Sequence, residues 1–168
     1  MSYRSTPATF RASVPAAGAL LLGLLLSGCG LIGGNDAQRD PSGTVTASST
    51  ADAFTIKVGD CVNEPEGTTF SEIVAIPCDQ PHDLEAYAST KLPDGDFPGR
   101  SAIGDKVDEF CDPKFLEFVG IAYNDSSLSS VPFTPTSESW SGGDREIVCL
   151  VGQEKTKTTG TLKSVRFC

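Results

Sequence analysis

Alternating apolar and polar residues predict a series of short strands after residue 53. Phe54–Val58 and Ser71–Pro77 are rich in β-branched residues, which favour strands. Leu84–Ala88 also alternates and follows a turn cluster at 79–83, so we expect it to pair back on Ser71–Pro77 as a hairpin. Three later strands are expected at 131–136, 146–151 and 161–165.

Helical spacing replaces this alternation between residues 103 and 120. Ile103, Val107, Phe110 and Cys111 recur at intervals of three and four. Asp112–Pro113 is typical of a cap followed by a first helical position, and Gly120 of a helix end. We therefore expect two short helices. The chain is predicted to be α+β: a small antiparallel sheet with a short helical pair packed on it, stapled by two disulfides.

The N-terminal apolar run is too short to cross a bilayer comfortably. It extends from about Val14 to Leu26, follows Arg4 and Arg11, and ends at Ser27-Gly28-Cys29. This arrangement resembles a bacterial lipoprotein signal. The resemblance implies that residues 1–28 are a signal peptide and that Cys29 carries palmitate-type acyl chains. A plain secretory signal cut elsewhere and an uncleaved anchor helix are the less favoured alternatives.

Residues 29–53 are expected to be a lipidated cysteine followed by a flexible tether. The segment is rich in Gly, Ser, Thr, Ala and Asp, and such a composition buries too little apolar surface to offset chain entropy. One folded domain is then expected over residues 54–168.

The chain is acidic, with a net charge of −9. Loss of residues 1–28 removes two arginines and no acid, which takes the charge to −11. This charge argues against binding to nucleic acid or to an anionic membrane surface. It suits a soluble body or a basic partner.

Five cysteines follow Cys29, and the oxidising compartment implied by the signal makes disulfides the default expectation. Cys168 ends the chain, where chains fray, so we expect it to be unpaired. Among the remaining arrangements we favour Cys61–Cys78 and Cys111–Cys149. A zinc site is not expected, because the sequence has no Cys-x-x-Cys pair and one histidine.

His82 is the one candidate for acid–base chemistry. It lies beside Asp79, Asp83 and Glu85, but general acid–base catalysis needs a second positioned group, and Cys78 is committed to a disulfide. We favour a turn-shaping role for Pro81-His82-Asp83. No catalytic, cofactor or metal residue is expected.

Two other clusters carry weaker signals. Asp94-Gly95-Asp96 lacks the spacing and the terminal glutamate of a calcium loop, so a solvated loop is favoured over a cation site. Trp140 precedes Gly142-Gly143-Asp144-Arg145, and we favour packing over ligand binding there. His82, Asp83, Trp140, Asp144 and Arg145 form the candidate functional surface.

Several of these pieces occur in an order that resembles the septum-formation domain of bacterial lipoproteins and membrane proteins. They are Gly59–Val62, Ile76–Glu85, Leu92–Pro93, Phe97–Gly99, Cys111, Trp140–Arg145 and Cys149–Val151. The resemblance spans about 58–162. It implies a family pattern of four cysteines, here Cys61, Cys78, Cys111 and Cys149, and a link to division septa. It implies no reaction, and Cys168 departs from the pattern.

We therefore expect a non-enzymatic module, lipid-anchored at the extracytoplasmic face of the cell membrane. It is expected to contact the membrane through the lipid on Cys29 and to bind a protein or cell-wall partner in envelope growth or septation. Two alternatives stay open. One is a cell-wall enzyme using His82 with nearby carboxylates, and the other is a cation-binding protein using the acidic loops.

Overall fold

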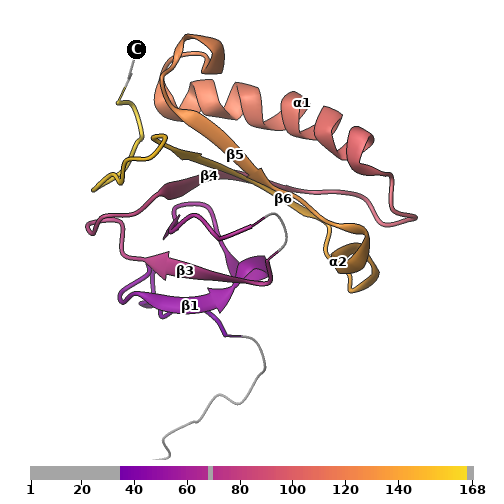
Figure 1. The fold of residues 1–168 in the computed structure, drawn as a ribbon, viewed down its shortest axis with the longest axis horizontal. Helices are drawn as coiled ribbons and strands as arrows, with labels where there is room; N and C mark the ends of the chain where they lie inside the picture. Colours follow the sequence, from indigo (N-terminus) through magenta and orange to yellow (C-terminus); the bar gives the residue numbers. More distant parts are fainter. Residues whose placement is uncertain (1–34, 68–69, 166–168) are drawn as a thin grey trace, which may run out of the picture. The chain divides into compact units, whose positions relative to one another are not determined.

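A six-stranded antiparallel sheet organises the residues that the computed structural model describes, 35–67 and 70–165. The strands lie in the order β1-β3-β2-β4-β6-β5 (Figure 1). Their bounds are β1 Ser49–Asp52, β2 Cys61–Val62, β3 Glu72–Ile76, β4 Leu84–Lys91, β5 Ser129–Phe133 and β6 Glu146–Gly152. The longest ladder joins β4 to β6, from Leu84–Gly152 at one end to Lys91–Glu146 at the other.

The strands expected near 71–77, 84–88, 131–136 and 146–151 are confirmed as β3, β4, β5 and β6. The expected β3–β4 hairpin is wrong, because β2 lies between these strands and pairs with both. Cys61 faces Ile76 on one side and Glu85 on the other.

Two other expected strands are absent from the described residues. At 54–58 the chain instead forms a 3₁₀ turn, Ala53–Thr55, because the Asp52 carboxylate accepts a hydrogen bond from the Phe54 N–H at 2.9 Å. At 161–165 the Leu162 N–H donates to the Glu85 carboxylate at 2.6 Å. The Leu162 N–H is therefore bound by a side chain and not by a neighbouring strand. The Leu162 side chain is buried.

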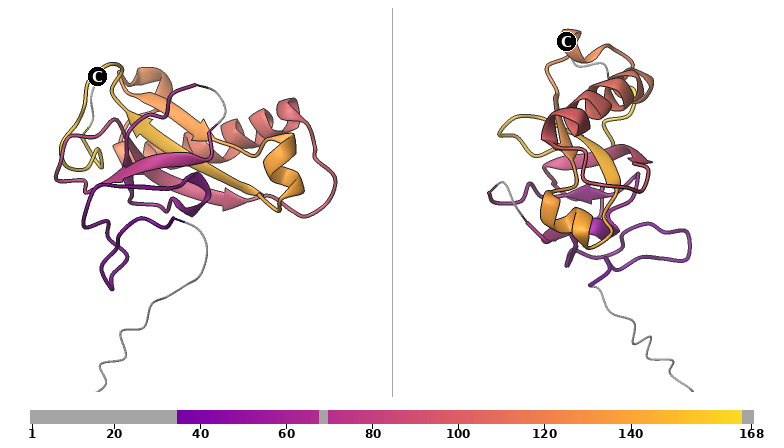
Figure 2. Two further views of the ribbon diagram at one scale, coloured as in Figure 1. Left: turned by 60° about the horizontal axis from the view of Figure 1, so that its bottom comes forward. Right: turned by 90° about the vertical axis from the view of Figure 1, so that its right-hand side faces the viewer.

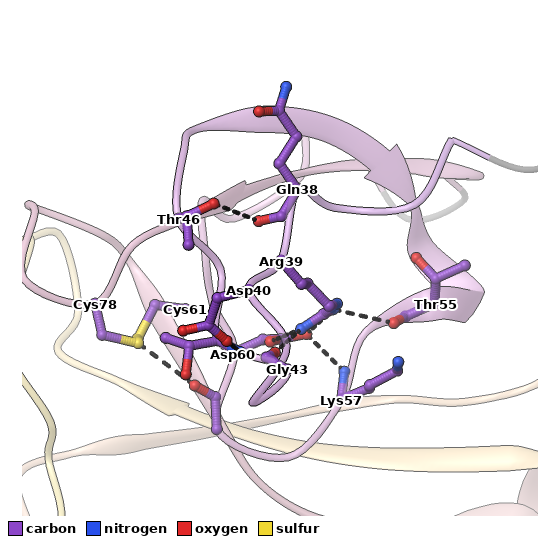
Figure 3. A network of polar contacts seen from close by, with 12 residues as sticks. Gln38, Arg39, Asp40, Gly43, Thr46, Thr55, Lys57, Asp60, Cys61 and Cys78 are labelled. Carbon is purple, nitrogen blue, oxygen red and sulfur yellow. Dashed lines mark hydrogen bonds and ion pairs between the residues drawn. A yellow bond between two sulfur atoms is a disulfide. The ribbon is translucent and has the colours of Figure 1, made fainter. Parts of the chain in front are cut away.

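The prediction of a flexible tether is wrong from residue 35 onward, because this segment is part of the folded sheet. Strand β1 pairs with β3, and small buried residues, Ala37, Ala51 and Ala75, pack where the two meet. Arg39 also forms a buried ion pair with Asp60, at 2.5 Å (Figure 3). Small side chains allow close packing, and this ion pair anchors a segment whose composition alone indicates disorder.

One continuous helix, α1 (Arg100–Val119), replaces the expected helical pair. Pro113 lies inside it, on the exposed side. Ile103, Cys111, Phe115 and Val119 are buried at multiples of four residues, which places them on one helix face. Burial of this face outweighs the local cost of an interior proline, about 3 kcal/mol. Gly120 ends the helix as expected, in a left-handed conformation. A short helix α2 (Ser137–Ser141) follows β5.

Residues of α1 pack on one face of β4, β5 and β6 (Figures 1 and 2). The core on this face contains Tyr87, Phe115, Ile147 and Val151, and burial raises the pKa of Tyr87 to about 12. A second core on the opposite face is made by alternate residues of the same strands, including Leu84, Val148 and Leu150.

Both expected disulfides are present. Cys61–Cys78 joins β2 to the end of β3, and Cys111–Cys149 joins α1 to β6. The α+β class with an antiparallel sheet and two disulfides is therefore confirmed. Within residues 35–67 and 70–165, no helix combines the length and the apolar character needed to cross a membrane.

Candidate functional site

His82 is buried and held by hydrogen bonds within the fold. Its ring is fully buried, with Nδ1 2.8 Å from the Gln80 carbonyl oxygen and Nε2 3.2 Å from the Thr158 hydroxyl. The backbone groups of His82 and Thr158 also bond to each other in both directions. The residue thus fastens the segment after β6 to the start of β4, which agrees with the turn-shaping role.

Two of the carboxylates near His82 in the sequence, Asp83 and Glu85, are engaged by other groups. Asp83 accepts hydrogen bonds from the Glu64 N–H and from Lys157 Nζ, at 3.1 and 2.7 Å. Glu85 is buried and binds the Thr161 hydroxyl and the Leu162 N–H. Neither acid contacts the imidazole in the hydrogen bonds described, so the geometry does not support a His–carboxylate catalytic pair.

Trp140 and Arg145 form a packed corner. The Trp140 indole is buried and donates to the Gly95 carbonyl at 2.8 Å. The Arg145 guanidinium carbon lies 3.8 Å from the indole ring centroid, and Arg145 donates to the Trp140 carbonyl. Asp144 accepts from the Ser139 hydroxyl and from the Glu146 N–H. These contacts fix the turn into β6, as the packing interpretation predicts.

The predicted functional surface is wrong as a single surface. His82 and Asp83 lie beside the Leu84–Gly152 end of the β4–β6 ladder, whereas Trp140 to Arg145 adjoin the Lys91–Glu146 end. Seven residues of strand separate these ends, roughly 23 Å at about 3.3 Å per residue. The fold therefore keeps the His82–Asp83 and Trp140–Arg145 clusters apart. Asp144 alone of the five also lines the groove described next.

A groove of about 940 Å³ lies beside the edge strand β5. One wall comes from α1 through Ile103, Gly104 and Val107. Phe54 and Phe70 also line the groove, as do Pro132 and Phe133 of β5. Ligand-binding clefts typically have volumes of about 300–1,000 Å³ and mainly apolar walls.

Phe54 is the clearest exposed apolar residue of the groove. It leaves 52% of its surface exposed, although it is a large aromatic side chain. Phe70, by contrast, packs edge to face on Phe133, with ring centroids 4.8 Å apart. The groove is therefore lined by Phe70 and Phe133, whose rings pack on each other, and by Phe54, whose exposed ring can contact a partner.

The polar lining of the groove is mostly acidic. Four carboxylates line it, from Asp108, Glu138, Asp144 and Glu146, against one cation, Arg100. Hydrogen bonding with its own backbone N–H, then with Thr136 and Ser137, lowers the pKa of Glu138, which keeps it ionised. The groove thus combines apolar walls with a negative edge.

Sequence reasoning missed this groove, because its residues come from segments far apart in the chain. One signal was available. Gly104 interrupts a helical pattern, and an isolated helical glycine costs about 1 kcal/mol relative to alanine. A Cβ built at Gly104 meets nothing within 4 Å, so no neighbour requires glycine there.

The lipidation residue Cys29 and the unassigned Cys168 lie outside the described residues. Within the part of the chain that is described, no group of three or more His, Cys, Asp or Glu side chains is placed to hold a metal ion.

Comparison with known protein families gives one match. A family model described as septum formation matches residues 25–149. The matched region includes all four disulfide cysteines and ends at Cys149. Comparison with curated proteins and with solved structures gave no significant match.

Proposed function

Because the chain belongs to the septum formation family, we propose that it is a lipid-anchored binding module at the extracytoplasmic face of the bacterial cell membrane. In this proposal it holds a protein partner in the β5 groove during septum formation. The groove with the exposed Phe54 is the observation that carries the proposal. Exposed apolar surface beside a formed cleft is typical of an interaction site.

The setting of His82 favours binding over catalysis. Both ring nitrogens are within hydrogen-bond distance of protein groups, and the ring is buried. A general base must reach a substrate proton, directly or through one water. Among the groove acids, Asp144 is already held by the Ser139 hydroxyl and the Glu146 N–H.

Substitution Cys29→Ala tests the anchor. The expected result is loss of radiolabelled palmitate from the chain and a shift of most of the protein from the membrane fraction to the soluble fraction. In the proposal the acyl chains on Cys29 are the anchor, and two such chains suffice for stable membrane attachment. Cys168→Ala is the matched control and should keep both label and membrane association. Label that persists in Cys29→Ala would contradict the proposal.

Substitution Phe54→Ser tests the groove. We expect a fluorescent fusion of the full chain to gather at division sites and Phe54→Ser to lose at least half of this enrichment, because the exposed ring contacts the partner. Leu116→Ser is the control: Leu116 is 49% exposed and lies outside the groove lining. Thermal unfolding should show both variants folded. Equal septal enrichment of wild type and Phe54→Ser would refute a role for the groove.

A further inference from the structure

The groove beside β5 has a charge pattern that restricts its partner. Among its lining acids, Asp108 and Glu138 are exposed, while Asp144 and Glu146 are half-buried. Arg100 is the single cation among its lining residues. The whole chain carries −9, so a second copy would bring like charge to the groove. Complementary charge favours correct partners and like charge rejects wrong ones.

The sheet edge suggests the shape of the partner. β5 ends the strand order, so no described strand pairs with its outer side. An extended segment can lie along such an edge and use backbone hydrogen bonds. Pro132, the fourth of the five residues of β5, has no N–H to offer, and proline at an edge discourages indiscriminate strand pairing. Side chains on the groove walls must then supply part of the recognition.

Gly104 leaves room for an apolar side chain of the partner. It lies on α1 between Arg100 and Asp108, next to Ile103 and Val107, all of them groove residues. The backbone conformation of Gly104 suits any L-residue, and space beside it is open. Glycine at this position lowers helix stability relative to alanine, although no neighbouring group requires glycine there. The open space over Gly104, which we call the Gly104 notch, is available to an apolar side chain of a partner.

We propose that the β5 groove binds an extended, basic segment of a partner protein, with an apolar side chain in the Gly104 notch and Lys or Arg side chains along Asp108 and Glu138. This inference rests on the proposed function, since it names the class of partner for the same groove.

Binding of three labelled dodecapeptides to the full-length chain in detergent tests the charge preference. The peptides share the same leucines and carry lysine, glutamine or glutamate at the other positions. At low salt the lysine peptide should bind at least about tenfold more tightly than the glutamine peptide, and the glutamate peptide should bind least. Equal or tighter binding of the glutamate peptide would overturn the inference.

Two pairs of variants test whether the lysine peptide binds in the groove. Gly104→Leu fills the notch and should weaken the lysine peptide at least about fivefold, while Ala102→Leu, exposed on the same helix but outside the groove lining, should not. Asp108→Lys should weaken it about fivefold or more, and Asp105→Lys, with the same charge change outside the lining, less than twofold. Equal effects within either pair would show that the peptide binds to general surface charge instead.

A photo-crosslinking residue in place of Phe54 distinguishes two claims: that the groove binds a protein partner, and that this partner is a basic segment. In dividing cells, a crosslink mapped to a basic, apolar peptide of another protein supports both. A crosslink to a second copy of the chain or to an acidic segment of a protein overturns the charge inference and leaves protein binding in the groove intact, whereas a crosslink to wall glycan overturns the protein partner as well. No groove crosslink, with the fusion still septal, overturns the groove as the binding site and the inference with it.

Discussion

Replacing Cys61, Cys78, Cys111 and Cys149 together with alanine should lower the free energy of unfolding by about 7 kcal/mol. The chain-entropy model gives about 3 kcal/mol for the 17-residue Cys61–Cys78 separation and about 4 kcal/mol for the 38 residues between Cys111 and Cys149. Domains of this size are typically stable by about 5–15 kcal/mol. The loss equals the whole stability of a domain in the lower part of that range, and removal of native disulfides from small secreted domains often abolishes folding at 37 °C, so we expect the four-alanine variant to be largely unfolded there.

The two bridges should differ in a predictable order. Cys111–Cys149 closes the longer loop and joins α1 to the centre of β6, with both cysteines almost fully buried. Cys61–Cys78 joins neighbouring strands that already share a ladder. Removal of the Cys111–Cys149 bridge should therefore cost more stability than removal of Cys61–Cys78, and it should also detach the α1 face of the core.

Urea unfolding of the oxidised wild type, the two paired variants and the four-alanine variant measures these differences. Adding reductant to the wild type should reproduce most of the loss, while the four-alanine variant should not respond to reductant. A four-alanine variant within about 2 kcal/mol of the wild type would contradict the entropic account, since the model assigns more than that to each bridge.

The strands that could best be predicted from the sequence are β3, β4 and β6. They were predictable because each is a run of apolar and β-branched residues bounded by turn signals, although only β3 has an exposed face and β4 and β6 are buried on both. The disulfide pairing was also predictable, from compartment, chain-end fraying and family resemblance together. α1 was found in place, but its continuity was not, because Pro113 is a strong local stop signal that burial of a whole helix face outweighs.

The rest depends on contacts between distant segments. β2 has two residues, too few to show any periodicity, yet it separates β3 from β4. β1 lies in a polar, small-residue segment that composition alone assigns to a tether. The groove depends on contacts of this kind, because it brings together Phe54, which follows β1, and Val107, which belongs to α1. Local patterns carry no information about that meeting of segments.

Breaking the Arg39–Asp60 pair should cost about 3–5 kcal/mol of unfolding free energy. The guanidinium binds both carboxylate oxygens of Asp60, at 2.5 and 2.6 Å, and the side chains are 11% and 4% exposed. Asp60 also accepts from the Lys57 N–H, and Arg39 donates to the carbonyls of Gly43 and Thr55 (Figure 3). Hydrogen bonding to Asp60 raises the pKa of Arg39, which keeps the guanidinium charged.

Asp60→Ala is the sharpest test of this pair, because it leaves the Arg39 charge buried without its partner. Urea unfolding should show the loss, and limited proteolysis should show faster cleavage within 35–48, the segment that Arg39 anchors. Glu109→Ala is the control: it breaks the exposed Lys106–Glu109 pair and should cost less than about 1 kcal/mol.

The double variant Arg39→Met, Asp60→Leu separates charge from packing. It removes both charges and leaves apolar side chains, so it should lose less stability than Asp60→Ala. That order would show that the single variant suffers mainly from an uncompensated buried charge. If Asp60→Ala cost less than about 1 kcal/mol, water would be reaching Arg39, and the segment before β1 would not depend on this pair for its place on the sheet.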